Sequence, residues 1–386
     1  MTQTREIPFG RPWITDADRE AVLRVLSGHI LTHGPECKGF EAEFGAFLGP
    51  GAHCVSVSSC MAALHLAYLQ LGIGEGDEVI VPALTHVATA HAVEWVKARP
   101  VFVDCEPATG NITAKAIEAA VTPRTKAIGL VHFVGIPCDM PSILAVAEKH
   151  RLKVVEDCAI AIGSRWGSTH VGLFGDVGCF SFYPVKHITT AEGGMLATRH
   201  ESIATAVASL RAFGVDRTQS RRQVPGMYEV TRIGLNYRMS ELQAALGRTQ
   251  MQRIDENLRR RRENFEIMRD GLKGLPVDVL DASSAQAKCS HYCLVAVLDP
   301  ALAPKRDAIV GRLNAAGIGT SVYYPQPVPR MKCYQEKYGY DAARFPNASR
   351  VSDAGIALPV AWHVSPDDAR FIGRTFREIV DQESAR

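Results

Sequence analysis

The chain has 386 residues and a mass of 42.0 kDa, more than a single hydrophobic core usually supports, so we expect a large domain and a smaller one. Hydrophobic residues make up 46% and charged residues 22%, which is typical of a folded globular protein and excludes a disordered chain. The formal net charge of +2 gives no long-range field for binding nucleic acid or an anionic membrane. We therefore expect small molecules or further copies of the chain as partners, with no nucleic acid and no membrane.

The sequence carries no recognisable export signal and no metal motif. Residues 1–10 lack the apolar run of a signal peptide, and no stretch of about 18 uncharged apolar residues follows, so we expect a cytoplasmic protein. The ten cysteines are scattered apart from Cys289 and Cys293, and no CxxC pair occurs. This spacing favours reduced core cysteines over a disulfide framework or a metal site.

Short apolar runs alternate with helical patterns between about residues 53 and 200, as in parallel strands joined by crossover helices. Helices are predicted over residues 61–71 and 139–150. Strands are predicted over residues 53–57, 78–81, 100–103, 126–131, 152–156, 177–182 and 195–198. The pattern indicates an α/β fold in which helices flank a large, mostly parallel sheet.

A long polar helix is predicted from Ser240 to about residue 272. Ser240 is a plausible N-cap, and Gln243 completes a capping box. The arginines at 259–262 lie within this helix, near acidic residues at helical spacing. This basic run therefore indicates a solvated helix face, not a nucleic-acid site.

The C-terminal part has a mixed pattern. It predicts a strand over residues 292–298, a helix over 304–315, a strand over 319–323 and a last helix opened by Ser365 and Pro366. We expect a large α/β domain over residues 1–250, and a connecting helix with a smaller α+β domain over residues 251–386.

The apolar strand that ends at residues 156–157 closes with two acids, Glu156 and Asp157. The carboxyl edge of an open α/β sheet is where such folds bind ligands. A buried acid at that edge needs a cationic partner. Alternatively, Asp157 caps the helix that follows.

A lysine follows a later strand. Residues 181–186 lead from Ser181 through a proline turn to Lys186, and a Glu-Gly-Gly turn follows at residues 192–194. A lysine at the end of a core strand is costly to bury unless it is neutral or converted into an imine. Considered alone, this segment favours a lysine at the surface.

A third segment turns a strand into a helix through Ser58, Ser59 and Cys60. Small polar residues at this point leave backbone N–H groups free at the positive end of a helix, which suits a phosphate. An ordinary capped helix is the simpler alternative.

Together, the three segments supply a phosphate site, a carboxylate for a pyridinium nitrogen and an imine-forming lysine. These are the groups that pyridoxal 5'-phosphate (PLP) requires.

With these segments in this order, the sequence resembles the DegT/StrS family of sugar aminotransferases, which are PLP enzymes of fold type I. The resemblance runs from residues 8–12 through residues 74–79 to residues 358–359. Its most specific stretches are residues 156–157, 181–194 and 234–239.

The resemblance implies a role for each matching residue. Lys186 would form the Schiff base with PLP and move a proton between substrate and cofactor, and Asp157 would pair with the pyridinium nitrogen. Ser181 and the N–H groups of Cys60 and Met61 would hold the phosphate. Asn236 would reach in from a second subunit, so the resemblance implies a homodimer with shared active sites.

Three positions depart from the family pattern. Cys60 and Met61 stand where Gly-Thr is common, so backbone donors remain, with Ser59 as a possible helper. His86 stands where an aromatic residue usually stacks on the cofactor ring. Ile160 replaces a glutamine and cannot donate a hydrogen bond to the phenolic oxygen of PLP.

The implied activity is transfer of an amino group from glutamate to a keto-sugar, above all a nucleotide-linked 4-keto-6-deoxyhexose, in making amino sugars for a surface polysaccharide or a secondary metabolite. Two alternatives stay open. A sugar dehydratase of the same family would replace the lysine by histidine, whereas here Lys186 is present and His187 is its neighbour. A regulatory or sensory homologue would have lost Lys186 or Asp157, or gained a basic DNA-binding segment.

Arginines precede the Asn236 segment, at Arg217, Arg221 and Arg222. Family resemblance places this region beside the sugar and its diphosphate. The arginines are compatible with a diphosphate clamp or with a solvated basic loop.

Overall fold

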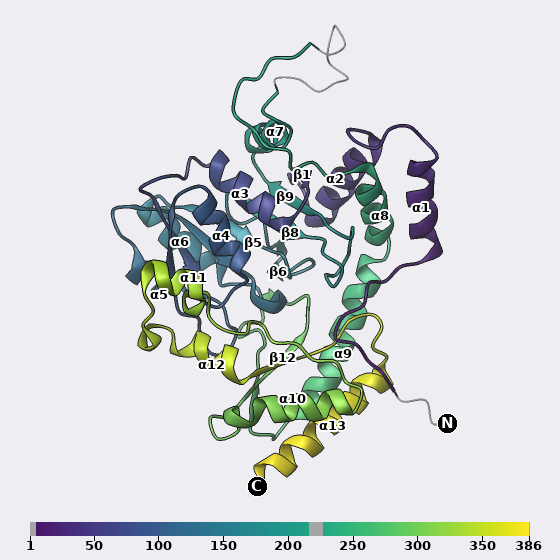
Figure 1. Cartoon of the computed structure of the whole chain (residues 1–386), viewed down its shortest axis with the longest axis vertical. Coiled ribbons are helices and arrows are strands. Elements are labelled where there is room, and N and C mark those ends of the chain that lie inside the picture. Colours follow the sequence, from purple (N-terminus) through teal and green to yellow (C-terminus); the bar gives the residue numbers. More distant parts are fainter. Residues whose placement is uncertain (1–4, 216–226, 386) are drawn as a thin grey trace.

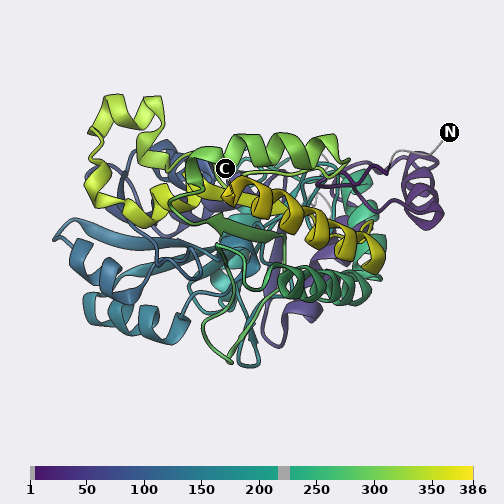
Figure 2. The same cartoon turned by 90° about the horizontal axis from the view of Figure 1, so that it is seen from below.

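The computed structural model describes residues 5–215 and 227–385 (Figures 1 and 2), so Arg217, Arg221 and Arg222 lie outside the described residues. The helices are α1 (Asp16–Leu26), α2 (Pro35–Leu48), α3 (Cys60–Gln70), α4 (Val87–Trp95), α5 (Ala114–Ala120), α6 (Met140–His150), α7 (Glu201–Leu210), α8 (Glu241–Met251), α9 (Ile254–Leu272), α10 (Arg306–Ala315), α11 (Lys332–Tyr338), α12 (Pro346–Ala354) and α13 (Pro366–Ser384). The strands are β1 (His53–Val57), β2 (Glu78–Pro82), β3 (Arg99–Val103), β4 (Thr125–Val131), β5 (Lys153–Asp157), β6 (Arg165–Trp166), β7 (Thr169–His170), β8 (Val177–Ser181), β9 (Gly194–Thr198), β10 (Val277–Val279), β11 (Ala287–Lys288), β12 (Leu294–Leu298) and β13 (Gly355–Leu358).

The strands predicted between residues 53 and 200 form one seven-stranded sheet in the order β1-β9-β8-β5-β4-β2-β3. Neighbours from β3 to β8 are parallel, whereas β9 runs antiparallel to both β8 and β1. The mostly parallel sheet expected from the sequence is confirmed. Because β9 runs backwards, its first residue lies at the same edge of the sheet as the last residues of β5 and β8.

Both faces of this sheet are buried, as the apolar strand sequences require. In β2, Val79 and Val81 join the core beneath α3 and α4, while Ile80 between them joins the core beneath α5 and α6. This alternation follows the two-residue period of a strand. On the second face α2 contributes Phe40 and Phe44, which contact Phe182 just beyond β8.

Side-chain caps begin several of the helices that the sequence predicted. Ser59 accepts a hydrogen bond from the Ala62 N–H at the start of α3. The capping box of Ser240 and Gln243 opens α8, and a second box opens α13 at Ser365. Such caps stabilise a helix end by about 1 kcal/mol each.

The smaller sheet has the antiparallel order β10-β12-β13. Its strands contact α9, α10 and α12, and α13 lies against both α9 and α10. Figure 2 shows α10 and α13 as neighbouring layers on this side of the molecule. A third sheet of short strands joins β11 to β6 and β7.

Two expected elements differ from the structure. The helix expected from Ser240 to residue 272 is broken, because the Arg253 N–H bonds to Gln250 three residues back and its side chain bonds to Asp18. The strand expected over residues 319–323 is reduced to one bridge between Ser321 and Ala357. Here Gly319 bonds to the N-terminal segment and does not extend the ladder with β13.

The solvated face expected for residues 259–262 is also partly wrong. Arg259 and Arg260 pair with Glu256 at the surface, as the spacing predicted. Arg261, however, is only 2% exposed. Residues at helical spacing after it, such as Phe265 and Met268, are buried too, so the periodicity of the sequence already placed Arg261 on the inner face.

Residues 7–13, here called the N-terminal strap, are held by residues from the far end of the chain. Ile7 exchanges backbone hydrogen bonds with residues 317 and 319, and His363 Nε2 donates to the Pro8 carbonyl over 2.7 Å. A Cβ atom at Gly10 would come within 2.7 Å of Val185 Cγ1, so the strap passes directly over the segment that carries Lys186.

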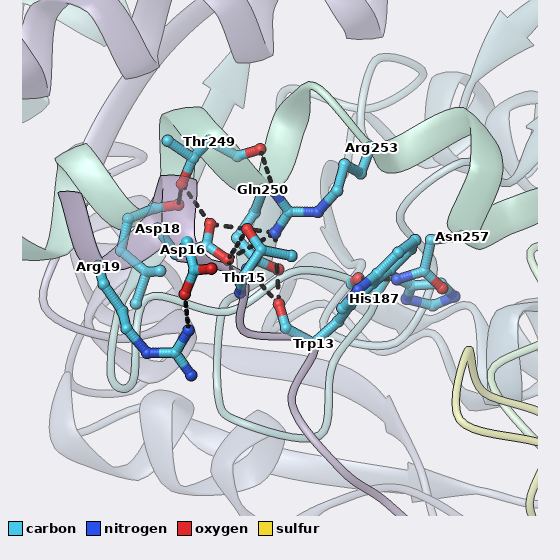
Figure 3. Close-up of polar contacts among 11 residues, drawn as sticks. Trp13, Thr15, Asp16, Asp18, Arg19, His187, Thr249, Gln250, Arg253 and Asn257 are labelled. Atoms are coloured by element: carbon cyan, nitrogen blue, oxygen red, sulfur yellow. Dashed lines mark hydrogen bonds and ion pairs between the residues drawn. The ribbon is translucent and has the colours of Figure 1, made fainter. Parts of the chain in front are cut away.

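A buried carboxylate anchors the end of the strap (Figure 3). Asp18 is 1% exposed and accepts hydrogen bonds from Thr15, Thr249 and Arg253. These bonds hold the pKa of Asp18 below its ordinary value, against the opposing effect of burial. The carboxylate thereby ties α1 to the break between α8 and α9.

None of the helices in the described ranges is both long and apolar enough to cross a membrane. All ten cysteines are free, and most are buried, although Cys333 is exposed. The expectation of unpaired core cysteines therefore applies to most of the ten.

A buried neutral histidine lies beside the large sheet. His170 is fully buried, its Nε2 accepts a hydrogen bond from the Gly163 N–H, and its Nδ1 donates to the Val171 carbonyl. Burial lowers the pKa of His170 to about 3. Protonation would also abolish the acceptor at Nε2.

We expect His170 to make the protein less stable in acid. Below about pH 6.5 the unfolded chain gains a proton at this histidine that the folded chain excludes, so the free energy of unfolding falls toward pH 3, by about 1.4 kcal/mol per pH unit from this group. Urea unfolding at pH 7 and pH 5 should show a smaller difference for His170→Gln than for the parent. The exposed-site variant His29→Gln serves as control, and equal pH dependence in all three proteins would refute the assignment.

Candidate active site

The candidate catalytic residues meet at one edge of the large sheet. Strand β5 ends at Asp157, β8 ends at Ser181, and antiparallel β9 begins at Gly194 opposite Ser181. Gly194 lies against the start of α3, where a Cβ atom would stand 2.4 Å from the Ser59 carbonyl carbon and 2.6 Å from the Cys60 nitrogen. The topology therefore brings the three sequence segments together.

Asp157 is a buried carboxylate whose hydrogen bonds come from neutral groups. It is 4% exposed, and its two oxygens accept hydrogen bonds from Thr89 Oγ1 at 2.8 Å and from the Ala159 N–H at 3.0 Å. Cys60 Sγ lies 3.8 Å from one oxygen. Among the described residues no cation forms an ion pair with Asp157, so the site has a buried negative charge that a cationic ligand group would compensate.

Glu156, the neighbour of Asp157 in the sequence, holds a loop in place and does not face the site. This side chain is fully buried and accepts hydrogen bonds from the backbone N–H groups of Gly172, Phe174 and Gly175 and from His132 Nε2. Successive strand residues point to opposite faces, so one acid organises a loop while the other faces the site. Of the carboxylate pair noted in the sequence, only Asp157 is available for chemistry.

Lys186 lies in the segment between β8 and β9. Its backbone N–H bonds to the Tyr183 carbonyl at 2.9 Å, and its Nζ lies 5.2 Å from the centre of the Tyr292 ring. Nζ forms no hydrogen bond or ion pair with the described residues. Burial lowers the pKa of Lys186, with Asp157 and Cys60 opposing the shift, so a larger share of the amine is neutral and nucleophilic.

The start of α3 can hold a phosphate. Ser59 caps the helix through Ala62, while the N–H groups of Cys60 and Met61 have no acceptor among the described residues. Across Gly194 lies Ser181, which is 7% exposed and whose Oγ accepts only a long bond of 3.4 Å from the Tyr183 N–H. Two free donors at a helix N-terminus and one hydroxyl form an anion site.

An aromatic wall completes the site. His86 caps α4 and contacts the Tyr324 ring edge-on at 5.7 Å, while Tyr323 joins its hydroxyl to that of Tyr292 at 2.8 Å. The sequence predicted His86 as a site residue, but Thr89, Tyr292, Tyr323 and Tyr324 were missed. Thr85 and Thr89 stand four residues apart in the sequence, and their hydroxyls lie 2.7 Å from each other. This spacing was a signal in the sequence that Thr89 belongs to the site.

Asn236 is exposed, and its backbone bridges to Ala212. The carbonyl of the next residue, Tyr237, accepts a hydrogen bond of 2.8 Å from the Ser58 N–H, just before the start of α3. Asn236 therefore lies on an exposed segment near the candidate phosphate site, and its role in a partner's site stays a prediction.

One buried group has the chemistry of metal ligands. Within the described ranges, His132, Glu156 and Cys158 place one ligand atom each within 4.8 Å of one another. Both ring nitrogens of His132 are already used, by Glu156 and by the Cys138 N–H. His132 therefore has no lone pair left to bind an ion, and it forms a buried hydrogen-bonded pair with Glu156.

The donor set of the site fits PLP. The free N–H groups of α3 and Ser181 suit its phosphate, the uncompensated Asp157 suits a protonated ring nitrogen, and the unpaired Lys186 amine suits its aldehyde. The fold and this set of side chains define a PLP-dependent aminotransferase.

Comparison with known proteins agrees with this class. The DegT/DnrJ/EryC1/StrS aminotransferase family matches residues 12–377, so the chain belongs to that family. The spore coat polysaccharide biosynthesis protein SpsC of Bacillus subtilis (strain 168) is 37% identical, covering 98% of this chain and 99% of that protein.

Solved structures of sugar aminotransferases share the fold. The putative sugar aminotransferase Spr1654 of Streptococcus pneumoniae, in its PMP form, has a TM-score of 0.92 at 28% identity and covers 98% of this chain and 100% of its own; its PLP form is also solved. DesV of S. venezuelae, in complex with a ketimine intermediate, has a TM-score of 0.88 at 32% identity, with 97% and 99% of the two chains covered.

We expect Asp157→Asn to leave the fold intact and to slow the reaction at least about 100-fold, because the lost charge would keep the ring nitrogen of PLP protonated and the ring able to accept negative charge in the transition state. Single-turnover rates with the amino donor, together with the affinity for PLP, would measure this. Affinity should fall far less than rate. The neighbouring Glu156→Gln should lower the melting temperature instead. Among the described residues no helix lies between β5 and β6 for Asp157 to cap, so normal turnover by Asp157→Asn would show that Asp157 only orders the turn at Ala159.

Proposed function

We propose that this enzyme transfers an amino group from glutamate to a nucleotide-linked keto-deoxysugar, in the biosynthesis of amino sugars for a surface polysaccharide or a secondary metabolite. The observation that carries the proposal is that two groups lie at the same sheet edge. One is the amine of Lys186, whose pKa is lowered by burial, and the other is the buried carboxylate of Asp157, whose hydrogen bonds come from neutral groups. Membership of a sugar aminotransferase family supports a sugar substrate. The named role of SpsC in polysaccharide biosynthesis supports the pathway class.

Each site residue has a role in this proposal. When bound, PLP supplies a ring that withdraws electrons from the substrate carbon that loses a proton. Lys186 would hold the aldehyde of PLP through Nζ and would move the proton at the substrate carbon. Asp157 would keep the ring nitrogen protonated, and the N–H groups of Cys60 and Met61 would hold the phosphate with Ser181. Ser59 caps this helix start, and His86 would lie beside the ring.

The proposal includes a homodimer in which Asn236 completes the partner's site. Two exposed apolar regions support it. One comprises Leu23, Leu26 and Ile30 on and after α1; the other includes Val230 and Ile233, the latter 96% exposed. Apolar surface of this kind is unusual on a monomer and suits an interface.

Two coarser expectations belong to the same proposal. The first is the division into a PLP-binding unit over residues 1–250 and a smaller unit over residues 251–386, which the separate three-stranded sheet β10-β12-β13 supports. The second is a cytoplasmic location, where glutamate and nucleotide sugars are available.

A substrate screen tests the chemistry. Glutamate should convert the bound cofactor to its pyridoxamine form, and a nucleotide-linked 4-keto-6-deoxyhexose should then remove the pyridoxamine absorbance. Lys186→Ala should show neither change. Reaction with free keto-sugars or keto-inositols alone would reject the nucleotide while leaving amino transfer intact. Failure of every keto-sugar, or of glutamate, would contradict the proposed reaction.

Mixing two inactive chains tests the shared site. Lys186→Ala and Asn236→Ala should each be impaired alone. A mixed dimer carries one site in which both residues are intact, so random exchange of equal amounts should restore about a quarter of all sites. Activity after mixing, with sedimentation to establish the dimer, is the measurement. A fully active monomer would refute the shared site. A proven dimer without recovery would show that Asn236 serves its own chain or only turns the backbone.

A further inference from the structure

Arg261 is a buried arginine without an acidic partner in the described part of the chain. It is 2% exposed, and burial lowers its pKa to about 10, so the guanidinium stays charged at neutral pH. Its neighbours Arg259 and Arg260 both pair with Glu256 at the surface. Burying a lone cation is costly, and an apolar residue would cost less at this position.

The hydrogen bonds of Arg261 go to two neutral acceptors. Its Nε donates to Asn257 Oδ1 and its terminal nitrogen to the Tyr292 carbonyl, both at 2.8 Å. The guanidinium also lies 5.9 Å from the centre of the Tyr292 ring. Asn257 and Tyr292 are each 4% exposed, so the three residues form a dry, fixed unit between α9 and the segment before β12.

Both residues that accept these hydrogen bonds, Asn257 and Tyr292, also lie against the segment that carries Lys186. Asn257 Nδ2 donates over 2.6 Å to the backbone carbonyl of His187, the residue that follows the lysine (Figure 3). The Tyr292 ring lies 5.2 Å from Lys186 Nζ. Thus one guanidinium orders both the residue that fixes the lysine backbone and the ring beside the lysine amine.

We propose that Arg261 is a positioning residue that, through Asn257 and Tyr292, holds Lys186 Nζ in the geometry for attack on the aldehyde of PLP. The inference rests on the Schiff-base role proposed for Lys186. In that step the lone pair of the neutral amine forms the new C–N bond, and the aldehyde oxygen leaves as water with the two amine protons. A displacement of about 1 Å is enough to slow such a step roughly 100-fold.

Three variants separate positioning from folding. Arg261→Met removes the charge and both hydrogen bonds while keeping the side-chain length. Asn257→Asp is isosteric, keeps an acceptor for Arg261 and supplies the missing negative charge, but loses the donor to the His187 carbonyl. Arg262→Met makes the same change at the adjacent, exposed position of α9 and serves as control.

The readouts distinguish cofactor binding from bond formation. Pyridoxamine phosphate uses the same phosphate site but forms no imine with lysine, so its affinity for each apoprotein reports binding alone. The rate at which imine absorbance appears after adding PLP reports attack by Nζ, and borohydride reduction with peptide mapping identifies the lysine. Melting temperatures of the apoproteins report folding.

We expect both buried variants to form the imine at least about tenfold more slowly than the parent and Arg262→Met, with pyridoxamine phosphate affinity changed less than about threefold. If folded Arg261→Met and Asn257→Asp form the imine as fast as the parent does, the inference is overturned. It is also overturned if the imine rate and the affinity for pyridoxamine phosphate fall by the same factor. If Arg261→Met fails to fold, Asn257→Asp decides alone. Parent protein labelled at another lysine would instead refute the proposed role of Lys186.

Discussion

The site is organised around Asp157, a buried carboxylate that forms no ion pair with the residues that the structure describes. Hydrogen bonds from Thr89 and from the Ala159 N–H orient this carboxylate, but both donors are neutral. Removing such a charge from water is unfavourable unless a cation arrives. The strand order, the reversal of β9 and the placement of α4 bring this carboxylate to the sheet edge from which the segment that carries Lys186 leaves.

The sequence predicted the parts of this arrangement that follow from strand geometry. Apolar runs ending in Asp157 and leading to Lys186 had to meet, because parallel strands share their carboxyl edge, and the seven-stranded sheet confirms it. Thr89 could not be found in the same way, since it reaches Asp157 from a helix 68 residues earlier in the chain. Likewise, the broken helix at Arg253 depends on Asp18, which no local pattern reveals.

Helix α9 illustrates a different limit. A run of basic residues looks uniform in sequence, yet Arg259 and Arg260 are solvated while Arg261 faces inward. The helical period of the apolar residues places Arg261 on the inner face of α9, whereas its charge alone would place it at the surface. The structure agrees with the period. The inward face of α9 thereby links the smaller sheet to the lysine segment.

The N-terminal strap has a consequence for the order of assembly. It covers the segment that carries Lys186, since Gly10 lies against Val185, yet it is held by the backbone near residue 318 and by His363. His363 follows Pro8 by 355 residues, so the ribosome makes the strap long before it makes this partner. The contacts near residue 318 and at His363 can form only after those later residues have emerged, so the cover over the lysine segment closes after the large sheet has been synthesised.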